Sequence, residues 1–448
     1  MKRKIRLGKQ RRYPLDELVE AVQTHSFDFK KSTVNFLLGT DRYIENEKRV
    51  GLIPQDIGKL HHALRDLGLS AEVYVIRAAG ERAGFVDEEY ATSGATIVKE
   101  DELSKLPGID VVHALKQPTE IEAEIPGRFL RLGALHLVTK PRETIAVLRK
   151  KNFAALFDGG TIGDCSYVLS GSDKTPVVAS MSRIAGDIAA SEVLKFGDLR
   201  SDKVIVVGAG NAGTRSILRL IDQVSDIVVI EIEPKLHKTI AYLLSKAGFP
   251  NYTILKELPA EVFKDAAGVI FAPSQGPLGA EEVCTFTDIC SMKTNACIAD
   301  IAIDQGGSIY LESINKSDDV QTRIVKYRNA LEANGYRYFA EPNIPAREPN
   351  KASIMHSSAV LPSCVALLVL CALYGDPESA ARELLSRDWK KITEYKELSQ
   401  EHRIDFYQCM MQDLRNGLQV SVRNGKLIVE DPRLDKKQDL KQWLQQFQ

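Results

Sequence analysis

The amino-acid sequence predicts an α/β protein with two Rossmann-like parallel-sheet domains. Two observations carry this expectation. The first part of the chain, to about residue 170, alternates short apolar strands with helical patterns, as a parallel α/β domain does. A second series then opens at residue 203, where a strand, a glycine-rich turn, a helix and another strand follow one another directly.

Length and composition agree with this class. The chain has 448 residues, enough for about two or three domains. Its formal net charge of −1 gives no basic field for nucleic acid. We interpret the basic stretch at residues 2–12 as a short solvated arm, because no apolar segment follows to make a signal peptide. The seven cysteines lack CxxC pairs and zinc-type spacing, so we expect reduced thiols, no metal and a cytoplasmic protein.

The elements of the first domain are predicted from apolar periodicity. Helices are expected over 14–25, 57–67 and 87–94, and strands over 34–39, 73–76, 110–115 and 129–137. Gly68 is the expected stop of the second helix.

The rest of the chain gives a second alternating series and a helical end. A long helix is expected from Met181 toward residue 196, and strands near Val204, Val228 and Val269, over 296–303 and near Phe339. From residue 350 to about 415 the pattern is helical, and a hairpin is predicted over 418–429 around Asn424-Gly425. The apolar run 359–374 is too short for a membrane span and is interrupted by Pro362, so a packed or interface helix is expected.

The stretch 203–234 carries the dinucleotide fingerprint, and each part has a physical task. Gly208 permits a tight turn, Gly210 lets the backbone approach a pyrophosphate, and Gly213 lets the helix close on the strand. The backbone of this loop, which also includes Ala209, Asn211 and Ala212, presents N–H groups to the phosphates. Glu231 ends the second strand, where it can bind both ribose hydroxyls and would repel a 2′-phosphate. We therefore predict NAD rather than NADP.

Motifs around this fingerprint resemble those of a known family. The matching stretches are 46–54 (NEKRVGLIP), 84–90 (GFVDEEY), 115–118 (LKQP), 135–137 (LHL), 181–182 (MS), 302–307 (AIDQGG), 343–345 (NIP) and 417–420 (GLQV). Over roughly residues 34–435 the chain resembles alanine dehydrogenase and its relatives. These include the NAD-binding part of proton-translocating transhydrogenase and the saccharopine-type and carboxyethyl-amino-acid reductases.

The resemblance implies a domain order. A discontinuous substrate domain would comprise residues 34–176 and, through a helical return with a C-terminal hairpin, residues 350–448. The NAD-binding Rossmann domain, 177–349, would be inserted into it, and residues 1–33 would be an extension. The family forms dimers or hexamers, so a homo-oligomer is expected.

The resemblance also implies residue roles. Arg49 would hold the substrate carboxylate, Lys116 would bind the substrate and polarise its carbonyl or imine, and His136 would act as acid and base. Asp304 would lie beside the nicotinamide and the reacting amine. Further contacts are implied for Asn343, with substrate and cofactor, and for Ser182, Ile301, Asp304 and Ile344, with the cofactor. The chemistry suits these residue types, because arginine binds carboxylates bidentately and histidine transfers protons near neutral pH. Singly, each residue also has an ordinary structural interpretation.

Three departures leave the substrate open. Ala134 stands where alanine dehydrogenases usually carry an aromatic residue, and the loop 272–277 differs from the family's apolar segment. The third departure is an N-terminal addition, residues 1–33, together with an enlarged segment around 376–413 that is expected to be helical. The leading hypothesis is NAD-dependent oxidative deamination of a small L-amino acid, alanine first. One alternative is an opine-type or saccharopine-type reductase that joins a 2-oxo acid to an amino-acid amine. Another is a non-catalytic NAD-binding subunit like that of transhydrogenase.

Overall fold

The computed structural model describes residues 14–24, 27–134, 151, 153–158, 177–195, 197–273, 282–315, 317–386, 414–415, 418–423 and 426–430. These residues form two compact units. The first unit takes in the chain up to Val178 and again from Ser353, and the second is the continuous segment Ala179–Ala352. The predicted insertion of one domain into another is therefore confirmed.

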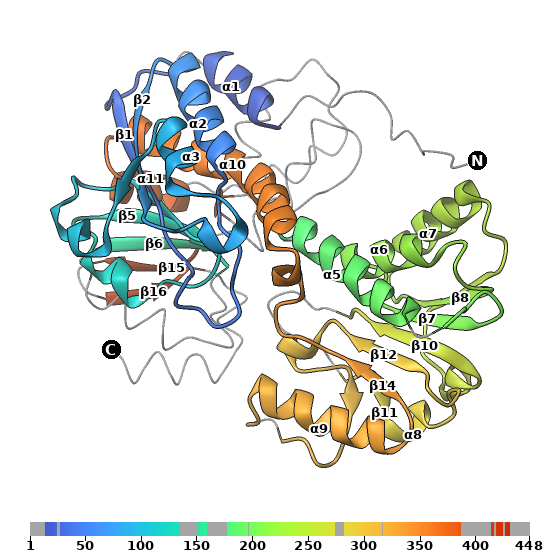
Figure 1. Cartoon of the computed structure of the whole chain (residues 1–448). Helices are drawn as coiled ribbons and strands as arrows, with labels where there is room; N and C mark the ends of the chain where they lie inside the picture. Colours follow the sequence, from blue (N-terminus) through green and yellow to red (C-terminus); the bar gives the residue numbers. More distant parts are fainter. Residues whose placement is uncertain are drawn as a thin grey trace. The chain divides into compact units, whose positions relative to one another are not determined.

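The sheet of the first unit has eight strands (Figure 1). They are β1 (Thr33–Leu38), β2 (Ser70–Ile76), β3 (Thr96–Val98), β4 (Val111–His113), β5 (Phe129–Gly133), β6 (Phe153–Asp158), β15 (Leu418–Arg423) and β16 (Lys426–Val429). Their order is β16-β15-β6-β5-β4-β1-β2-β3, and all neighbours from β6 to β3 are parallel. The predicted hairpin is confirmed, since β15 pairs antiparallel with both β16 and β6. The turn residues Asn424 and Gly425 lie outside the described residues.

The helices of the first unit surround one long apolar helix. They are α1 (Pro14–Thr24), α2 (Pro54–Asp66), α3 (Asp87–Thr92), α10 (Pro349–Tyr374, which begins in the second unit) and α11 (Pro377–Ser386). The side chains of α10 from Cys364 to Ala372 are fully buried against β1 and α2 in the hydrophobic core. The expected packed helix is thus observed. Within the described part of the chain, α10 alone has the length and hydropathy of a membrane span, and most of it is buried in the protein.

The burial of α10 bears on assembly. An apolar helix that is covered by its own unit needs no second subunit to shield it. The homo-oligomer therefore stays a prediction that rests on the family resemblance alone.

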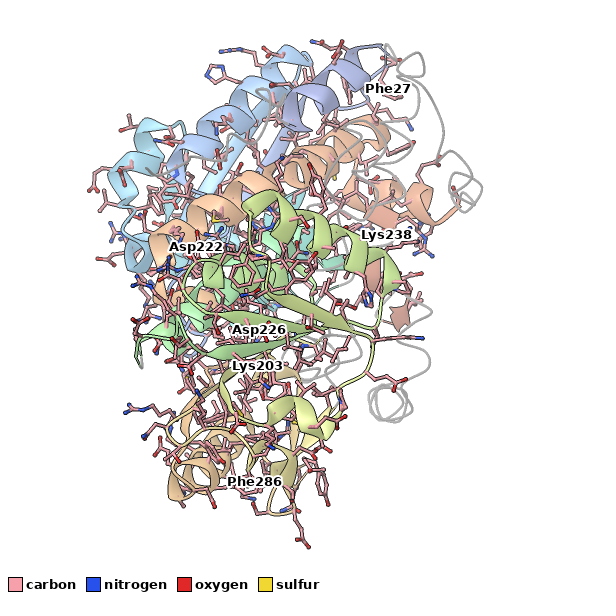
Figure 2. All side chains as sticks on the ribbon, turned by 90° about the vertical axis from the view of Figure 1, so that its right-hand side faces the viewer. Phe27, Lys203, Asp222, Asp226, Lys238 and Phe286 are labelled. Carbon is pink, nitrogen blue, oxygen red and sulfur yellow. The ribbon has the colours of Figure 1, made fainter. Side chains whose placement is uncertain are left out.

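The second unit contains a six-stranded, fully parallel sheet. Its strands are β7 (Lys203–Val207), β8 (Asp226–Ile230), β9 (Tyr252–Leu255), β10 (Ala266–Phe271), β12 (Cys297–Asp300) and β14 (Arg337–Phe339). A separate pair consists of β11 (Cys284–Thr285) and β13 (Ile309–Tyr310). At the amino ends of β7 and β8, Lys203 and Asp226 are paired in register (Figure 2).

Both sheets share one topology. The second sheet reads β9-β8-β7-β10-β12-β14, which is the doubly wound order 3-2-1-4-5-6, and the six parallel strands of the first sheet have the same order. The two Rossmann-like domains predicted from the sequence are confirmed. Each sheet has a switch point, at β1/β4 and at β7/β10, and ligands of such sheets bind beyond the carboxyl ends of the strands there.

The helices of the second unit are α5 (Val177–Leu194), α6 (Asn211–Leu220), α7 (Pro234–Ala247), α8 (Phe286–Ile289) and α9 (Val320–Ala333). Helix α5 packs closely on α6. A Cβ added at Gly186 would lie 2.1 Å from the carbonyl oxygen of Ala212, and the Ser216 hydroxyl donates to the Gly186 carbonyl at 2.9 Å. A glycine at position 186 is therefore required for this close contact between α5 and α6.

Some predicted bounds were wrong. The strand expected over 296–303 ends at Asp300, because the chain turns there into the 3₁₀ helix η6 (Ile303–Gln305). Strands β3, β6 and β9 were not predicted; β3 and β9 are short and only partly buried, which gives them a weak apolar pattern. The helical segment expected to reach residue 415 is described as far as Ser386 and again at 414–415.

Candidate active site

The glycine loop after β7 has the geometry that its sequence predicts. Gly208 has a positive φ of 85°, and a Cβ there would lie 2.6 Å from the carbonyl oxygen of Ala272. A Cβ at Gly213 would lie 1.7 Å from the Gly208 carbonyl oxygen, so any side chain would push α6 away from the loop. At Gly210 a Cβ would meet nothing within 4 Å in the part of the chain that the structure describes. Two glycines are therefore required by packing, and the third faces open space at the N-terminus of α6.

Glu231 holds this loop in place. It follows β8 and is buried, with Oε2 accepting from the Ala209 N–H at 2.6 Å and Oε1 from the Glu233 N–H at 2.8 Å. A carboxylate oxygen can accept more than one hydrogen bond, so these contacts leave the group able to bind hydroxyls as well. The structure thus adds a loop-positioning role to the predicted ribose contact.

Asp300 shapes the loop that carries Asp304. Its buried carboxylate accepts from the Ala302 N–H at 3.0 Å, the Ser308 N–H at 2.9 Å and the Ser308 hydroxyl at 3.0 Å. Burial raises the pKa of Asp300 to about 6 in spite of these bonds. Asp304 lies in η6 between the two anchored ends of the loop.

The other predicted residues of this unit are placed as follows. Ile301 follows β12, Asn343 precedes the 3₁₀ helix η7 (Ile344–Arg347) after β14, and Ser182 lies in α5. Because β7, β8, β12 and β14 are parallel, the loops that carry the glycines, Glu231, Asp304 and Asn343 leave one edge of the sheet.

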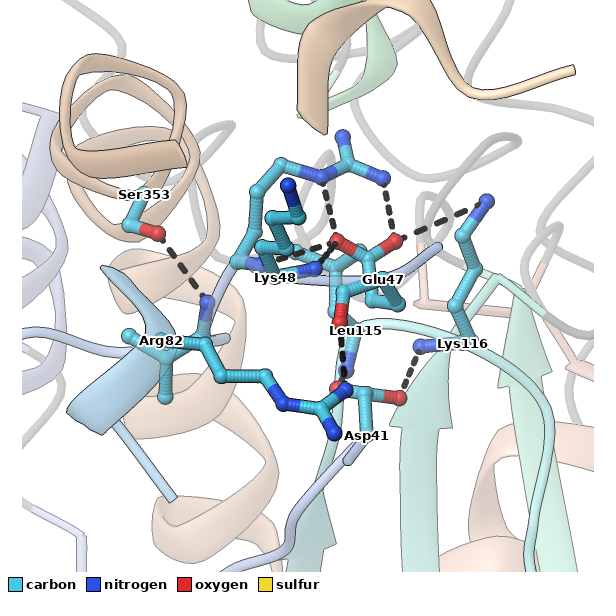
Figure 3. A network of polar contacts seen from close by, with 9 residues as sticks. Asp41, Glu47, Lys48, Arg82, Leu115, Lys116 and Ser353 are labelled. Carbon is cyan, nitrogen blue, oxygen red and sulfur yellow. Dashed lines mark hydrogen bonds and ion pairs between the residues drawn. The ribbon is translucent and has the colours of Figure 1, made fainter. Parts of the chain in front are cut away.

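A cluster of charged side chains lies at the switch point of the first unit. The Arg49 guanidinium donates to Glu47 through Nε (2.8 Å to Oε1) and Nη2 (2.6 Å to Oε2), and both side chains are buried. Lys116 Nζ lies 4.0 Å from the same Oε2 (Figure 3). Burial alone would raise the pKa of Glu47, but Arg49 and Lys116 outweigh it and lower the value to about 2. The carboxylate therefore stays ionised between two cations.

The backbone around this cluster is fixed by two further side chains. The Asp41 carboxylate, just beyond β1, accepts from the N–H groups of Leu115 at 2.8 Å and Lys116 at 2.9 Å, just beyond β4 (Figure 3). Burial, together with the charge of Glu47, raises the pKa of Asp41 to about 6. On the other side, the Val50 N–H donates to the Ser353 hydroxyl of α10 at 3.0 Å.

The structure brings some of the predicted residues together. Arg49 and Lys116 share the charged cluster of the first unit, and the Ala134 N–H donates to the Leu115 carbonyl at 3.0 Å, beside Lys116. His136 lies outside the described residues. The chemical roles of all these residues remain predictions.

Three positioning residues were not identified from the sequence: Asp41, Glu47 and Asp300. Each had a recognisable sequence pattern. Asp41 and Asp300 are acids at or just beyond the carboxyl end of an apolar strand, and Glu47 stands two residues before Arg49 in a motif from which only the arginine was chosen.

Comparison with protein families agrees with this geometry. The models for the N-terminal and C-terminal domains of alanine dehydrogenase/PNT match residues 43–185 and 182–372. The chain belongs to the alanine dehydrogenase/PNT family. The first match includes Arg49, Lys116 and His136, and the second includes the glycine loop and Asp304. Helix α1 and the C-terminal hairpin lie outside both matches.

Individual relatives point the same way. Alanine dehydrogenase of Staphylococcus epidermidis (strain RP62A) is 28% identical over 331 residues, which cover 71% of this chain and 83% of that protein. Alanine dehydrogenase 2 of Staphylococcus aureus (strain Mu50) is 27% identical over 349 residues, covering 74% and 87%. Membership of this family indicates an oxidoreductase.

Two solved structures share the fold. An L-alanine dehydrogenase has a TM-score of 0.62 at 20% identity and covers 91% of this chain and 99% of its own. A transhydrogenase from Sinorhizobium meliloti has a TM-score of 0.58 at 18% identity and covers 76% and 95%.

The Glu47 pair predicts a stability defect with a defined pH dependence. Glu47→Gln leaves the buried Arg49 without its counter-charge, so we expect a loss of about 3–5 kcal/mol of unfolding free energy at pH 7, measured by urea denaturation. Because folding lowers the pKa of Glu47 from 4.5 to about 2, the ionised carboxylate stabilises the fold above pH 4.5, and this contribution is lost as the pH falls toward 2. The difference in unfolding free energy between the variant and wild type should therefore become smaller as the pH falls from 4.5 to about 2.

The matched control is Glu45→Gln, an exposed glutamate on the same loop. It should change the unfolding free energy by less than about 0.5 kcal/mol. Equal stability of Glu47→Gln and wild type at pH 7 would show that Arg49 does not depend on Glu47.

Proposed function

We propose that the protein is a cytoplasmic, NAD-dependent amino-acid dehydrogenase that reversibly deaminates a small L-amino acid, with alanine and pyruvate as the first pair to test. The observation that carries this proposal is the pair of cations, Arg49 and Lys116, fixed around Glu47 at the switch point of the first unit. Two cationic side chains held at one point beyond the strands suit the carboxylate of an amino or 2-oxo acid, which an arginine can bind through two hydrogen bonds.

The chain's own residues divide the work of the reaction. Arg49 binds the carboxylate, and Lys116 polarises the carbonyl oxygen or imine nitrogen as negative charge develops there. In this proposal His136 transfers the proton, and Asp304 is the residue that the family resemblance assigns to the reacting amine. The bound cofactor supplies the hydride chemistry.

The second unit fits a dinucleotide. The open face of Gly210 leaves room for a pyrophosphate, the first turn of α6 supplies N–H groups, and Glu231 supplies the acceptor for ribose hydroxyls. The proposed reaction does not require a metal ion.

A second candidate function rests on Ala134. The Ala134 N–H donates to the carbonyl of Leu115, the residue before Lys116. The aromatic residue that the family usually carries at this position would narrow the substrate site. Room at this position favours a larger 2-oxo acid or a second amino acid as amine donor, as in an opine-type reductase. A purely NAD-presenting subunit has no use for the Arg49 and Lys116 pair.

We predict that NAD binds at least 100-fold more tightly than NADP. The buried carboxylate of Glu231 would face the 2′-phosphate with like charge, and such contacts cost several kcal/mol. Fluorescence titration of the purified protein with NADH and NADPH measures the ratio. Tighter binding of NADPH than of NADH would show that Glu231 does not contact the ribose.

A control for the location of binding is Gly210→Ala. Its added Cβ meets nothing within 4 Å among the described residues, so the thermal midpoint should stay unchanged while NADH affinity falls at least tenfold. Unchanged affinity would place the nucleotide elsewhere.

We predict that Lys116→Ala and His136→Ala each lower kcat at least 1,000-fold while NADH affinity stays within a few-fold. Both residues belong to the first unit's sequence and not to the glycine loop, so they should affect chemistry and substrate binding alone. Steady-state rates of NADH oxidation with pyruvate and ammonia give the test. If a variant keeps a tenth of wild-type activity or more, the residue that it replaces is not catalytic.

Ala134→Phe separates the two candidate functions. If Ala134 lines the substrate site, phenylalanine should lower kcat/KM for 2-oxo acids with several extra carbons, or for amino-acid amines, at least tenfold more than for pyruvate and ammonia. A panel of acids and amines assayed with NADH supplies the comparison. Equal losses for all partners would place Ala134 outside the site and favour the plain alanine dehydrogenase.

A further inference from the structure

Helix α10 presents three polar side chains on one face of an otherwise apolar segment. Ser353, His356 and Ser357 are spaced i, i+3 and i+4, and all three are buried. The Ser353 hydroxyl accepts from the Val50 N–H at 3.0 Å. The Ser357 hydroxyl accepts from the Ile53 N–H at 3.0 Å and donates to the Asp56 carboxylate. This face of α10 therefore lies against the loop that follows Arg49.

His356, between the two serines, differs from both. Its side chain is 92% buried by area, since only 8% of the residue is exposed, yet neither Nδ1 nor Nε2 has a hydrogen-bond partner among the described residues. The ring lies parallel to that of His113, with centroids 5.8 Å apart and 9° between the planes. His113 ends β4, three residues before Lys116, and its Nδ1 lies 3.1 Å from the Leu132 carbonyl oxygen.

His356 lies within the electrostatic range of the charged cluster. The charges of Arg49, Glu47 and Lys116 all act on its imidazole, and so does the ring of His113. Burial, reinforced by His113 and Arg49, lowers the pKa of His356 well below its usual value. A neutral imidazole has one N–H donor and one nitrogen acceptor. In His356 neither nitrogen has a partner among the described residues, although the residue lies one helical turn from Ser353, whose hydroxyl accepts from the Val50 N–H next to Arg49.

Unpaired polar atoms in a protein interior are rare and costly, and a native structure keeps them where a ligand or water completes them. A leucine would fill the space beside His113 without this cost. The side chain of His356 is therefore better explained by a ligand than by packing.

We propose that His356 is a specificity-determining residue whose imidazole hydrogen-bonds a neutral polar group, a hydroxyl or an amide, on the side chain of the bound amino or 2-oxo acid. This inference rests on the proposed function and names its substrate class. A second carboxylate fits less well, because the buried imidazole of His356 is neutral and brings no positive charge to balance it.

Hydroxypyruvate and 2-oxobutyrate test the proposal, because they differ by a hydroxyl in place of a methyl group of similar size. We expect wild type to favour hydroxypyruvate at least tenfold in kcat/KM, mainly through KM, because a site built to bond a hydroxyl discriminates against an analogue that lacks it. His356→Leu should remove or reverse this preference while NADH affinity stays within a few-fold. His356→Gln, which keeps a donor and an acceptor, should retain part of it and guards against a folding defect in the leucine variant.

The matched control is His62→Leu, an exposed histidine on α2 of the same unit, which should leave the ratio unchanged. An unchanged ratio in His356→Leu, or a wild type that favours 2-oxobutyrate, would overturn the assignment.

Failure of the proposed function is a separate outcome. If no 2-oxo acid is reduced with any amine, calorimetric binding of the two acids to the protein loaded with NAD still measures discrimination without turnover. Tighter binding of hydroxypyruvate that is lost in His356→Leu would support the role of His356. Equal binding, or none, would overturn it.

Discussion

The buried carboxylate of Glu47 is the constraint on which the first unit's site depends. Two cations held close together inside a protein repel each other, and burial adds a desolvation cost for each. The Glu47 carboxylate offsets the repulsion and the desolvation cost. Arg49 donates to it through Nε and Nη2, and Lys116 Nζ lies near Oε2, which also accepts from Arg49 Nη2. The cluster can therefore form without a bound ligand.

Carboxylates perform a similar task at three other points of the fold. Asp41 bonds the backbone beyond β4, Glu231 bonds the glycine loop beyond β7, and Asp300 bonds both ends of the loop beyond β12. In each case an acid at the carboxyl end of a parallel strand satisfies backbone N–H groups that have no strand partner, which is a general requirement for buried backbone. These hydrogen bonds fix the loops that carry the candidate site residues to the ends of the strands. The site residues are therefore held in defined positions.

The sequence was sufficient for features that depend on local patterns. The spacing of Gly208, Gly210 and Gly213 predicted a tight loop, and the structure confirms the close approach of the helix to the loop at Gly213. The contact of Gly208 with Ala272, just beyond the distant strand β10, was not predicted. The apolar run of α10 predicted a packed helix, but only tertiary burial distinguishes a core helix from an interface or a membrane span. The roles of Glu47 and His356 were not predicted. Each depends in part on a partner from a distant segment of the chain, Lys116 for Glu47 and His113 for His356, which only the fold brings close.

The same distinction explains why family membership settles less about the substrate than about the reaction. Binding a carboxylate and positioning a dinucleotide are common to every acid the family could use, so the groups that do it lie in the shared motifs. The side chain of the acid is recognised by other positions, and one methylene or hydroxyl changes discrimination by only about 1–3 kcal/mol in an apolar pocket. A single residue can supply that much. Ala134 and His356 both lie outside the motifs that carry the resemblance, and both belong to the unit with the charged cluster. A chain at 27–28% identity to alanine dehydrogenases can therefore retain their chemistry and accept a different acid.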